Sequence, residues 1–206
     1  MSISLLFLDT ETTGLYPKKN TIHQLAATAV CVSDRQPNIT ASFNQYLAPG
    51  PEDVVESTAL KVAGKTLDEI NKYPSRYDGA LAFAKFCTDF KKNADDNQLI
   101  ITGYNAPFDR DFVRELLYKC GMKNMYWDLF SKYIVDLYGF VQLLRSVKIF
   151  PALNLLSSLS LESVCKFFIK DIPPDFHDAR KDVDASIALY KEFHGFFPIL
   201  FLNIKG

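Results

Sequence analysis

One stretch near the N-terminus dominates the sequence: Leu5-Leu6-Phe7-Leu8-Asp9-Thr10-Glu11-Thr12-Thr13-Gly14-Leu15. Its four leading apolar residues predict a strand buried on both faces, and the Thr-Thr-Gly that follows is typical of an exit turn. Residues two apart in an extended chain point to the same side, so the carboxylates of Asp9 and Glu11 face one way and repel each other. A raised pKa on one acid or a bound hard cation such as Mg²⁺ or Mn²⁺ would offset that repulsion. The alternative is that both acids cap a nearby turn.

The composition bounds the class of protein. The chain has 206 residues, 48% hydrophobic and 14% aromatic, which is enough for one sizeable core. No linker, low-complexity tract or internal repeat marks a boundary, so we expect a single domain over residues 1–206. A net charge of -1 and a pI near 6.3 argue against a broad basic face. Any contact with nucleic acid is therefore expected to be local.

The cysteines and the apolar runs bear on location. Four cysteines stand apart in apolar stretches, with no Cys-x-x-Cys pair, which is typical of reduced, buried thiols in a cytosolic protein: Cys31, Cys87, Cys120 and Cys165. The N-terminus does not resemble a signal peptide, and no apolar run approaches the roughly 20 residues that span a bilayer. We expect a cytoplasmic protein with no membrane partner, whose apolar tail at Phe196–Ile204 packs on the core or on a partner.

Strands and helices are expected in a fixed order. Short connections predict a three-stranded antiparallel meander, made by the Asp9 strand and the segments Ile22–Val32 and Thr40–Leu47, and Leu99–Ile101 and Tyr133–Val135 are further strands. Helical spacing predicts two short helices split at Gly64 within Glu52–Tyr73, and longer helices over Tyr77–Lys92, from Pro107 onward, over Leu137–Val147, over Leu161–Ile169, and from about Phe176 to Phe193. The apolar face of the Tyr77–Lys92 helix is expected to comprise Leu81, Phe83, Ala84, Phe86, Cys87 and Phe90.

Two acids follow the later strands. Asp109 shares a helical stripe with Phe112, Val113 and Leu116, so it is expected to pack inward, where a carboxylate is costly unless it is paired or bound to metal. Asp136 most simply caps the helix that starts at Leu137.

The last helix opens with several polar residues. Asp182 shares a face with small residues suited to close packing, whereas Asp184 is expected to be solvated. Asp178 is either the buried acid or a favourable charge at the helix N-terminus, and the second interpretation is preferred. His177, which alone would suggest a surface or capping histidine, is a candidate base because it precedes a buried acid. The remaining histidines, His23 and His194, are expected to be structural.

Three motifs in order resemble one known family: Asp9-x-Glu11, Asn105-x-x-Phe108-Asp109 and His177-x-Ala179-x-x-Asp182. Over roughly Leu5 to Phe193 the chain is similar to the DEDDh (DnaQ-like) 3′-to-5′ exonucleases. The resemblance implies an α/β fold of the ribonuclease H-like type. In that fold a mixed five-stranded sheet, with an antiparallel meander first and parallel strands after it, is flanked by helices on both faces.

The same resemblance implies roles for particular residues. Two Mg²⁺ or Mn²⁺ ions would be held by Asp9, Glu11, Asp109 and Asp182, with His177 as the general base. The terminal nucleotide would be met by Thr12, Thr13, Gly14, Leu15, Asn105 and Phe108. Many relatives carry His-Gly-Ile-Thr after the meander where this chain has Ala63-Gly64-Lys65-Thr66, so the histidine contact is missing and Lys65 is the candidate for a phosphate contact.

The activity that the resemblance implies is metal-dependent hydrolysis of phosphodiester bonds from the 3′ end of single-stranded nucleic acid. DNA is favoured over RNA, nucleoside 5′-monophosphates are the products, and proofreading or repair is the implied role. A polymerase or a replication or repair protein is the implied partner, and the oligomeric state is left open. Two alternatives remain, an RNA-trimming exoribonuclease of the same family and a catalytically inactive nucleic-acid-binding module.

Overall fold

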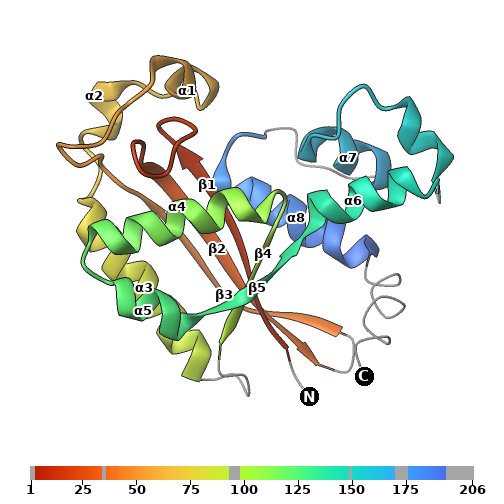
Figure 1. Cartoon of the computed structure of the whole chain (residues 1–206), viewed down its shortest axis with the longest axis horizontal. Helices are drawn as coiled ribbons and strands as arrows, with labels where there is room; N and C mark the ends of the chain where they lie inside the picture. The colour runs from red at the N-terminus through yellow and green to blue at the C-terminus, as the bar shows by residue number, and fades with distance from the viewer. Residues whose placement is uncertain (1–2, 34–35, 93–97, 149, 170–175, 194–206) are drawn as a thin grey trace.

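A computed structural model describes residues 3–33, 36–92, 98–148, 150–169 and 176–193. Its single five-stranded sheet has the order β3-β2-β1-β4-β5 (Figure 1). The strands β1 (Ile3–Thr12), β2 (Ile22–Ser33) and β3 (Gln36–Tyr46) form an antiparallel meander. The strands β4 (Leu99–Gly103) and β5 (Phe130–Asp136) add to it in parallel with β1. The predicted mixed sheet is confirmed.

Helices cover both faces of this sheet (Figure 1). After β3 come the short helices α1 (Ser57–Val62) and α2 (Leu67–Ile70). One face is covered by α3 (Arg76–Lys92), α4 (Ala106–Lys119) and α5 (Lys123–Leu129). The other is covered by α6 (Leu137–Ser146), the 3₁₀ helix η1 (Pro151–Leu155), α7 (Leu161–Phe168) and α8 (Ala179–Phe193). The sequence pattern did not indicate α5 or η1.

The alternation of side chains in β1 creates two cores. Leu6 and Leu8 pack in the core beneath α3 to α5, whereas Leu5 and Phe7 pack in the core beneath α6 to α8. All four side chains are at most 3% exposed. This is why the strand needs four consecutive apolar residues, as the sequence indicated.

One expected core residue is placed wrongly by the sequence. Leu81 is 49% exposed, while Phe83 on the same helix is fully buried. Residues two positions apart on an α-helix are separated by about 200° around its axis, so both side chains cannot face the sheet. The prediction that Leu81 belongs to the apolar face is therefore incorrect.

The remaining structural expectations concern single residues. All four cysteines are free thiols, of which Cys87 and Cys165 are buried and the others half-buried. His23 is buried within β2. His194 and the tail Phe196–Ile204 lie outside the described residues. None of the helices described is both long and apolar enough to cross a bilayer.

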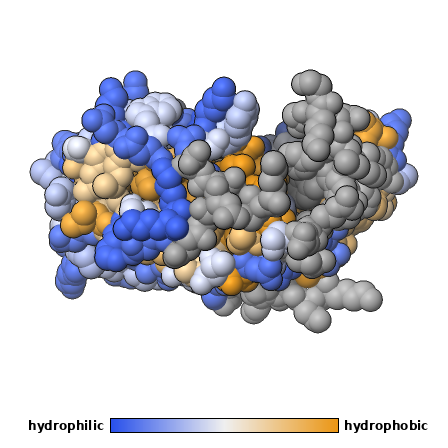
Figure 2. All heavy atoms as spheres, turned by 90° about the horizontal axis from the view of Figure 1, so that it is seen from below, coloured by the Kyte–Doolittle hydropathy of each residue, from blue (hydrophilic) through white to orange (hydrophobic). Residues whose placement is uncertain are grey.

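The parallel arrangement gathers strand ends at one edge. The carboxyl ends of β1, β4 and β5 point to the same side, at the top of Figure 1. Figure 2 views the molecule from below the orientation of Figure 1, and there hydrophobic patches show among hydrophilic residues at the left and near the middle. The acids of β1 and the start of α4 therefore lie at the edge turned away from that view.

The close approach of β1 and β4 depends on Gly103. A Cβ atom added there would lie 2.7 Å from the Leu8 carbonyl oxygen, which is backbone and cannot move aside. At Gly139, in the first turn of α6, an added Cβ would come no nearer than 3.2 Å, to the side chain of Asp136.

We expect Gly103→Ala to lower the free energy of unfolding by about 1 to 3 kcal/mol, because the two strands must separate to admit the methyl group. Gly139→Ala, the matched control in α6, should change it by less than about 1 kcal/mol, because alanine favours a helix and offsets a small shift of the Asp136 side chain. Urea unfolding of both variants measures the difference. Equal stability of the two variants would contradict the role assigned to Gly103.

Candidate active site

Three carboxylates meet where β1 leaves the sheet. Asp9 and Glu11 come from β1 and Asp182 from α8, and one oxygen of each lies within 4.8 Å of the others. The two β1 acids point to the side on which α8 packs, as their spacing predicts. The first turn of α8 then brings Asp182 over them.

The fourth predicted acid, Asp109, lies beside this group. It is 4% exposed in the first turn of α4, and the Thr10 hydroxyl donates a hydrogen bond of 2.7 Å to its Oδ1. Thr10 stands between Asp9 and Glu11 and points to the opposite side of β1. Its hydrogen bond ties α4 to the acidic strand, a contact that sequence reasoning missed.

Burial and mutual repulsion raise the pKa values of these acids. Burial, followed by the charge of Asp109, raises the pKa of Asp9 well above its usual value. Burial and the nearby Asp182 raise the pKa of Glu11 to about 7. Burial raises the pKa of Asp109 to about 7 against the opposing Thr10 hydrogen bond, and that of Asp182 to about 6. The fold therefore concentrates carboxylates that no ion pair among the described residues neutralises.

The donor set fits a hard divalent cation. Carboxylate oxygens are the ligands that Mg²⁺ and Mn²⁺ prefer. Asp182 Oδ1 is buried and accepts no hydrogen bond within the described part of the chain. The Asp182 carboxylate also belongs to the group formed with Asp9 and Glu11. A cation bound there would neutralise the negative charge of the group and contact the unpartnered oxygen.

His177 lies immediately before α8, and its ring is exposed. Its backbone adopts a left-handed φ of 69°, which is unfavourable for a residue with a side chain. The His177 N–H group lies 3.4 Å from Asp182 Oδ2, a long hydrogen bond that links the histidine to the acid cluster. The chain thus brings His177 next to Asp182, as the motif spacing predicts.

The neighbouring acids have structural contacts. Asp178 Oδ1 accepts hydrogen bonds from the backbone N–H groups of Arg180 and Lys181, so it caps α8 as the sequence favoured. Gln24 also donates to Asp178, at 3.1 Å. Asp184 is exposed and pairs with Arg180, in agreement with the expected solvated position.

The turn from Thr12 to Leu15 is held rigidly except at its last residue. Thr12 donates to the Gly14 carbonyl oxygen at 2.7 Å, and the buried Thr13 donates to the Val54 carbonyl oxygen at 2.9 Å. Leu15 is 70% exposed. The turn therefore presents one apolar side chain to solvent from a fixed backbone.

Asn20 is the residue that closes this turn, and sequence reasoning did not single it out. Its amide nitrogen donates to the Val54 carbonyl oxygen at 2.9 Å and to the Glu56 carboxylate at 3.1 Å, while its oxygen accepts from the Tyr16 N–H group at 2.8 Å. A Cβ atom added at Gly14 would lie 2.4 Å from Asn20 and from Glu56. The only local signal was an asparagine at the end of a Pro-Lys-Lys loop, which is a common turn residue.

Asp136 joins two elements at the edge. It caps α6 through the N–H groups of Tyr138 and Gly139, as predicted. The same carboxylate also accepts the Asn105 N–H at 2.9 Å and the Ala106 N–H at 3.3 Å, which the sequence did not indicate. Asn105 is exposed and has a left-handed φ of 66°.

Two further candidates lie near the start of α4 and after α1. Phe108 is half-buried, and its ring lies 4.8 Å from that of Phe112. Lys65 forms an ion pair of 2.7 Å with Glu69 and lies over the Tyr46 ring. A phosphate that binds Lys65 would have to compete with the Glu69 carboxylate. The predicted phosphate contact of Lys65 stays a prediction.

The buried charge predicts an unusual pH dependence when divalent cations are removed. Because the folded-state pKa of Glu11 is raised, the stability that its protonated form contributes is present below about pH 4.5 and is lost as pH rises to about 7. We expect Glu11→Gln in EDTA to raise the free energy of unfolding by about 2 to 3 kcal/mol at pH 8 and to leave it unchanged near pH 4. Urea unfolding at both pH values measures this.

Glu192→Gln, the same chemical change on the exposed face of α8, is the matched control and should have little effect at either pH. Mn²⁺ should stabilise the parent protein more than the Glu11→Gln variant, because a ligand stabilises the state that binds it. A Glu11→Gln variant less stable than the parent at pH 8 would contradict the repulsion.

Solved structures with the same fold include several of exonuclease I. The zinc-bound complex of E. coli exonuclease I with single-stranded DNA matches with a TM-score of 0.78 at 24% identity. Its complex with a dA16 oligonucleotide matches at 0.74 and 21%, and exonuclease I of Methylocaldum szegediense at 0.69 and 21%. Each match covers 97% of this chain but only 42% of the exonuclease I chain. A sequence search of curated proteins gave no match.

A family model gives the sequence-level evidence. The model named RNase_T and described as exonuclease matches residues 6–190, which include all three motifs. The fold agrees with this match, because the mixed sheet and its flanking helices are those expected for the family. The chain therefore belongs to this exonuclease family, the DnaQ-like (DEDDh) group of the ribonuclease H-like superfamily.

Proposed function

We propose that residues 1–206 act as one metal-dependent 3′-to-5′ exonuclease domain that removes nucleoside 5′-monophosphates from single-stranded nucleic acid, with DNA as the favoured substrate. The observation that carries this proposal is the group of three carboxylates within 4.8 Å, one of which keeps a buried oxygen without a donor in the described structure. Family membership supports exonuclease chemistry. The E. coli exonuclease I structures with single-stranded DNA support the choice of substrate.

Four acids are proposed to hold two Mg²⁺ or Mn²⁺ ions. Asp9, Glu11 and Asp182 would hold one ion, and Asp109, whose charge also acts on Asp9, would help to hold the second. Such ions, when bound, polarise the phosphate, activate water and stabilise the leaving oxygen. The chain fixes the acids on β1, α4 and α8, so their geometry is set before substrate arrives.

His177 is proposed to take the proton of the attacking water. Its N–H group contacts Asp182, so the ring starts from a backbone anchored at the acid cluster, and its exposure leaves room for water and substrate. The left-handed φ of 69° is the kind of local strain that persists where surrounding contacts hold a functional residue in place. A base must be neutral to accept this proton, so the unprotonated histidine is the working form.

The terminal nucleotide is proposed to lie between the turn after β1 and the start of α4. Leu15 offers exposed apolar surface from a fixed turn, Phe108 offers a half-buried ring, and Asn105 offers an exposed amide. Apolar and stacking contacts accept any base, as an enzyme that removes successive nucleotides requires. Thr12, Thr13 and Gly14 would place backbone groups near the 3′ hydroxyl.

The direct test uses 5′-end-labelled single-stranded DNA and RNA of one sequence, incubated side by side with Mg²⁺. We expect a ladder that shortens from the 3′ end, a faster rate on DNA, release of 5′-monophosphates and complete inhibition by EDTA. A circular single strand should remain intact, because it has no 3′ end. Cutting of the circle would contradict exonuclease action, a faster rate on RNA would favour the exoribonuclease alternative, and binding without cleavage would favour an inactive module.

Replacement of His177 separates a catalytic base from a structural residue. His177→Ala should lower kcat by about 10²- to 10⁴-fold, the usual contribution of a positioned base, while Mn²⁺ binding and the KM for substrate stay nearly unchanged. Asp178→Asn is the control, because asparagine caps a helix as well as aspartate does and should keep nearly full activity. A His177→Ala variant that turns over at the parent rate would overturn the assignment.

A further inference from the structure

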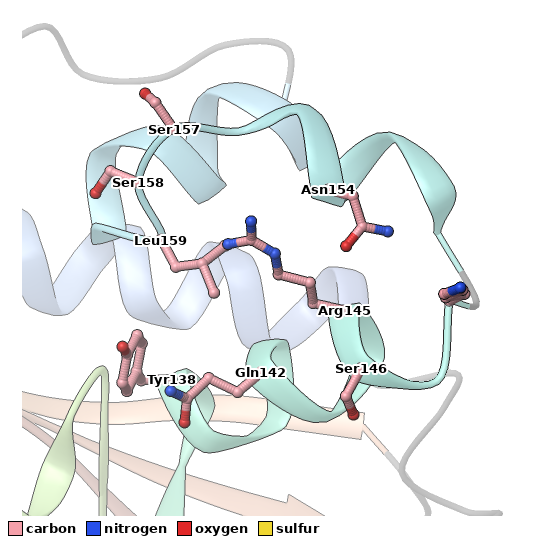
Figure 3. A pocket seen from close by; sticks show the side chains of 9 residues that line it. Tyr138, Gln142, Arg145, Ser146, Asn154, Ser157, Ser158 and Leu159 are labelled. Atoms are coloured by element: carbon pink, nitrogen blue, oxygen red, sulfur yellow. The ribbon is translucent and has the colours of Figure 1, made fainter.

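A polar cavity lies on the face of the sheet that α8 also covers, between α6 and the segment from η1 to the start of α7. Its volume is about 580 Å³, and Figure 3 shows its walls. Nine residues line it: Tyr138, Gln142, Arg145, Ser146, Lys148, Asn154, Ser157, Ser158 and Leu159. None of the roles proposed above uses this cavity.

The charge of the lining has one sign. Arg145 and Lys148 line the cavity, and no acid is among the nine residues. Neither cation takes part in an ion pair with any residue that the structure describes. Figure 3 shows the Arg145 side chain reaching from α6 toward Leu159 on the opposite wall. Two cations thus line an open space in a chain whose net charge is -1.

The neutral side chains of the lining add hydrogen-bond donors. Ser158 already accepts a bond from the Ser160 N–H group, so its hydroxyl proton can point elsewhere. The exposed amides of Gln142 and Asn154 and the exposed hydroxyl of Ser157 can donate as well. A phosphodiester group only accepts hydrogen bonds, so a cationic wall rich in donors matches its chemistry.

The cavity is connected to the predicted 3′-end site through Asp136. Asp136 Oδ1 accepts the N–H group of Asn105 at 2.9 Å and that of Tyr138 at 3.2 Å. The Tyr138 ring, which lines the cavity, also packs against Tyr104 at 5.5 Å. Tyr104 in turn donates a hydrogen bond to the Leu159 carbonyl oxygen on the far wall. One carboxylate therefore holds both Asn105 and Tyr138, the lining residue at the start of α6.

A purely structural role explains only part of this arrangement. Arg145 lies in the last turn of α6, where a cation interacts favourably with the helix C-terminus. That interaction does not explain why Lys148 also lines the cavity. It also does not explain why the opposite wall, made by η1 and the segment before α7, contains no acid.

We propose that this cavity is a phosphate subsite that holds the backbone of a single strand a few nucleotides on the 5′ side of its cleaved end, with Arg145 and Lys148 as the charged ligands. The inference rests on the proposed function, because the subsite would bind the same strand whose 3′ end lies at the acid cluster. The subsite would attract a polyanion to a protein whose candidate active site is acidic. Because the subsite contacts only the phosphate backbone of the strand, it does not distinguish base sequences.

The first test compares substrates of two lengths. Arg145 lies nine residues after Asp136, about 14 Å along α6. We therefore expect the dinucleotide dT2 at the acid cluster to be too short to reach Arg145, whereas dT12 can occupy both. We expect Arg145→Gln with Lys148→Gln to raise the KM for dT12 by about ten-fold and to leave kcat on both substrates and the KM for dT2 unchanged. Arg145→Lys should keep most of the affinity, since it retains the charge. Lys92→Gln, which removes an exposed cation from the last turn of α3 on the other face of the sheet, is the matched control.

The second test measures binding without cleavage. Fluorescence anisotropy of labelled dT12 in EDTA, over a range of salt concentration, reports phosphate binding directly. The slope of log K against log salt should become shallower in the double variant by about 0.7 for each phosphate that the protein no longer neutralises. Thermal unfolding of the double variant should match that of the parent, which would show that the weaker binding does not come from misfolding.

The outcomes separate this subsite from the proposed activity. A parent protein that binds dT12 in a manner dependent on Arg145 and Lys148 but cleaves nothing would refute the exonuclease and keep the subsite. A parent protein that cleaves dT12 while the double variant shows the same KM and salt slope would refute the subsite alone. Equal losses of activity on dT2 and dT12 would also overturn it, because they would place the two cations in the catalytic site or in folding.

Discussion

Repulsion between closely spaced, half-buried carboxylates is the constraint on which the rest of this structure depends. Asp9, Glu11 and Asp182 have oxygens within 4.8 Å of one another, and their pKa values are raised because burial and like charge both disfavour ionisation. Such a cluster lowers the free energy of unfolding of the chain. It persists because the two hydrophobic cores on either side of β1 supply far more stabilisation than the cluster removes.

The rest of the site consists of contacts that hold the acidic edge in shape. Thr10 ties Asp109 to β1, Asp136 ties the start of α4 to the start of α6, and Asn20 closes the turn after β1. None of these three residues belongs to the motifs that identify the family. They are neutral or capping groups whose side chains satisfy polar groups at strand and helix ends, where the backbone has no partners of its own.

An acidic site that acts on a polyanion needs cations nearby. Divalent ions would supply some of that charge at the cluster, and the Arg145 and Lys148 cavity supplies positive charge from the protein itself. The separation is physically reasonable, because a lysine or arginine placed among the acids would pair with them and compete with the metal. Cations set apart from the acids would attract the strand and leave the acids free to bind metal.

The sequence by itself determined most of the strands and helices and the positions of the acids on them. Four apolar residues before Asp9 predicted a strand buried on both faces, and helical spacing placed Asp109 and Asp182 on inward stripes, because these patterns depend only on local geometry. Leu81 was placed wrongly and α5 was missed, because short or mixed apolar runs fit more than one local structure. Only the tertiary structure decided which acids lie together. The Asp109 carboxylate accepts a hydrogen bond from Thr10, whereas the Asp182 carboxylate lies near those of Asp9 and Glu11. The tertiary structure alone also revealed Asn20, the second role of Asp136 and the cationic cavity, because these depend on contacts between residues far apart in the chain, for which a single sequence carries no local signal.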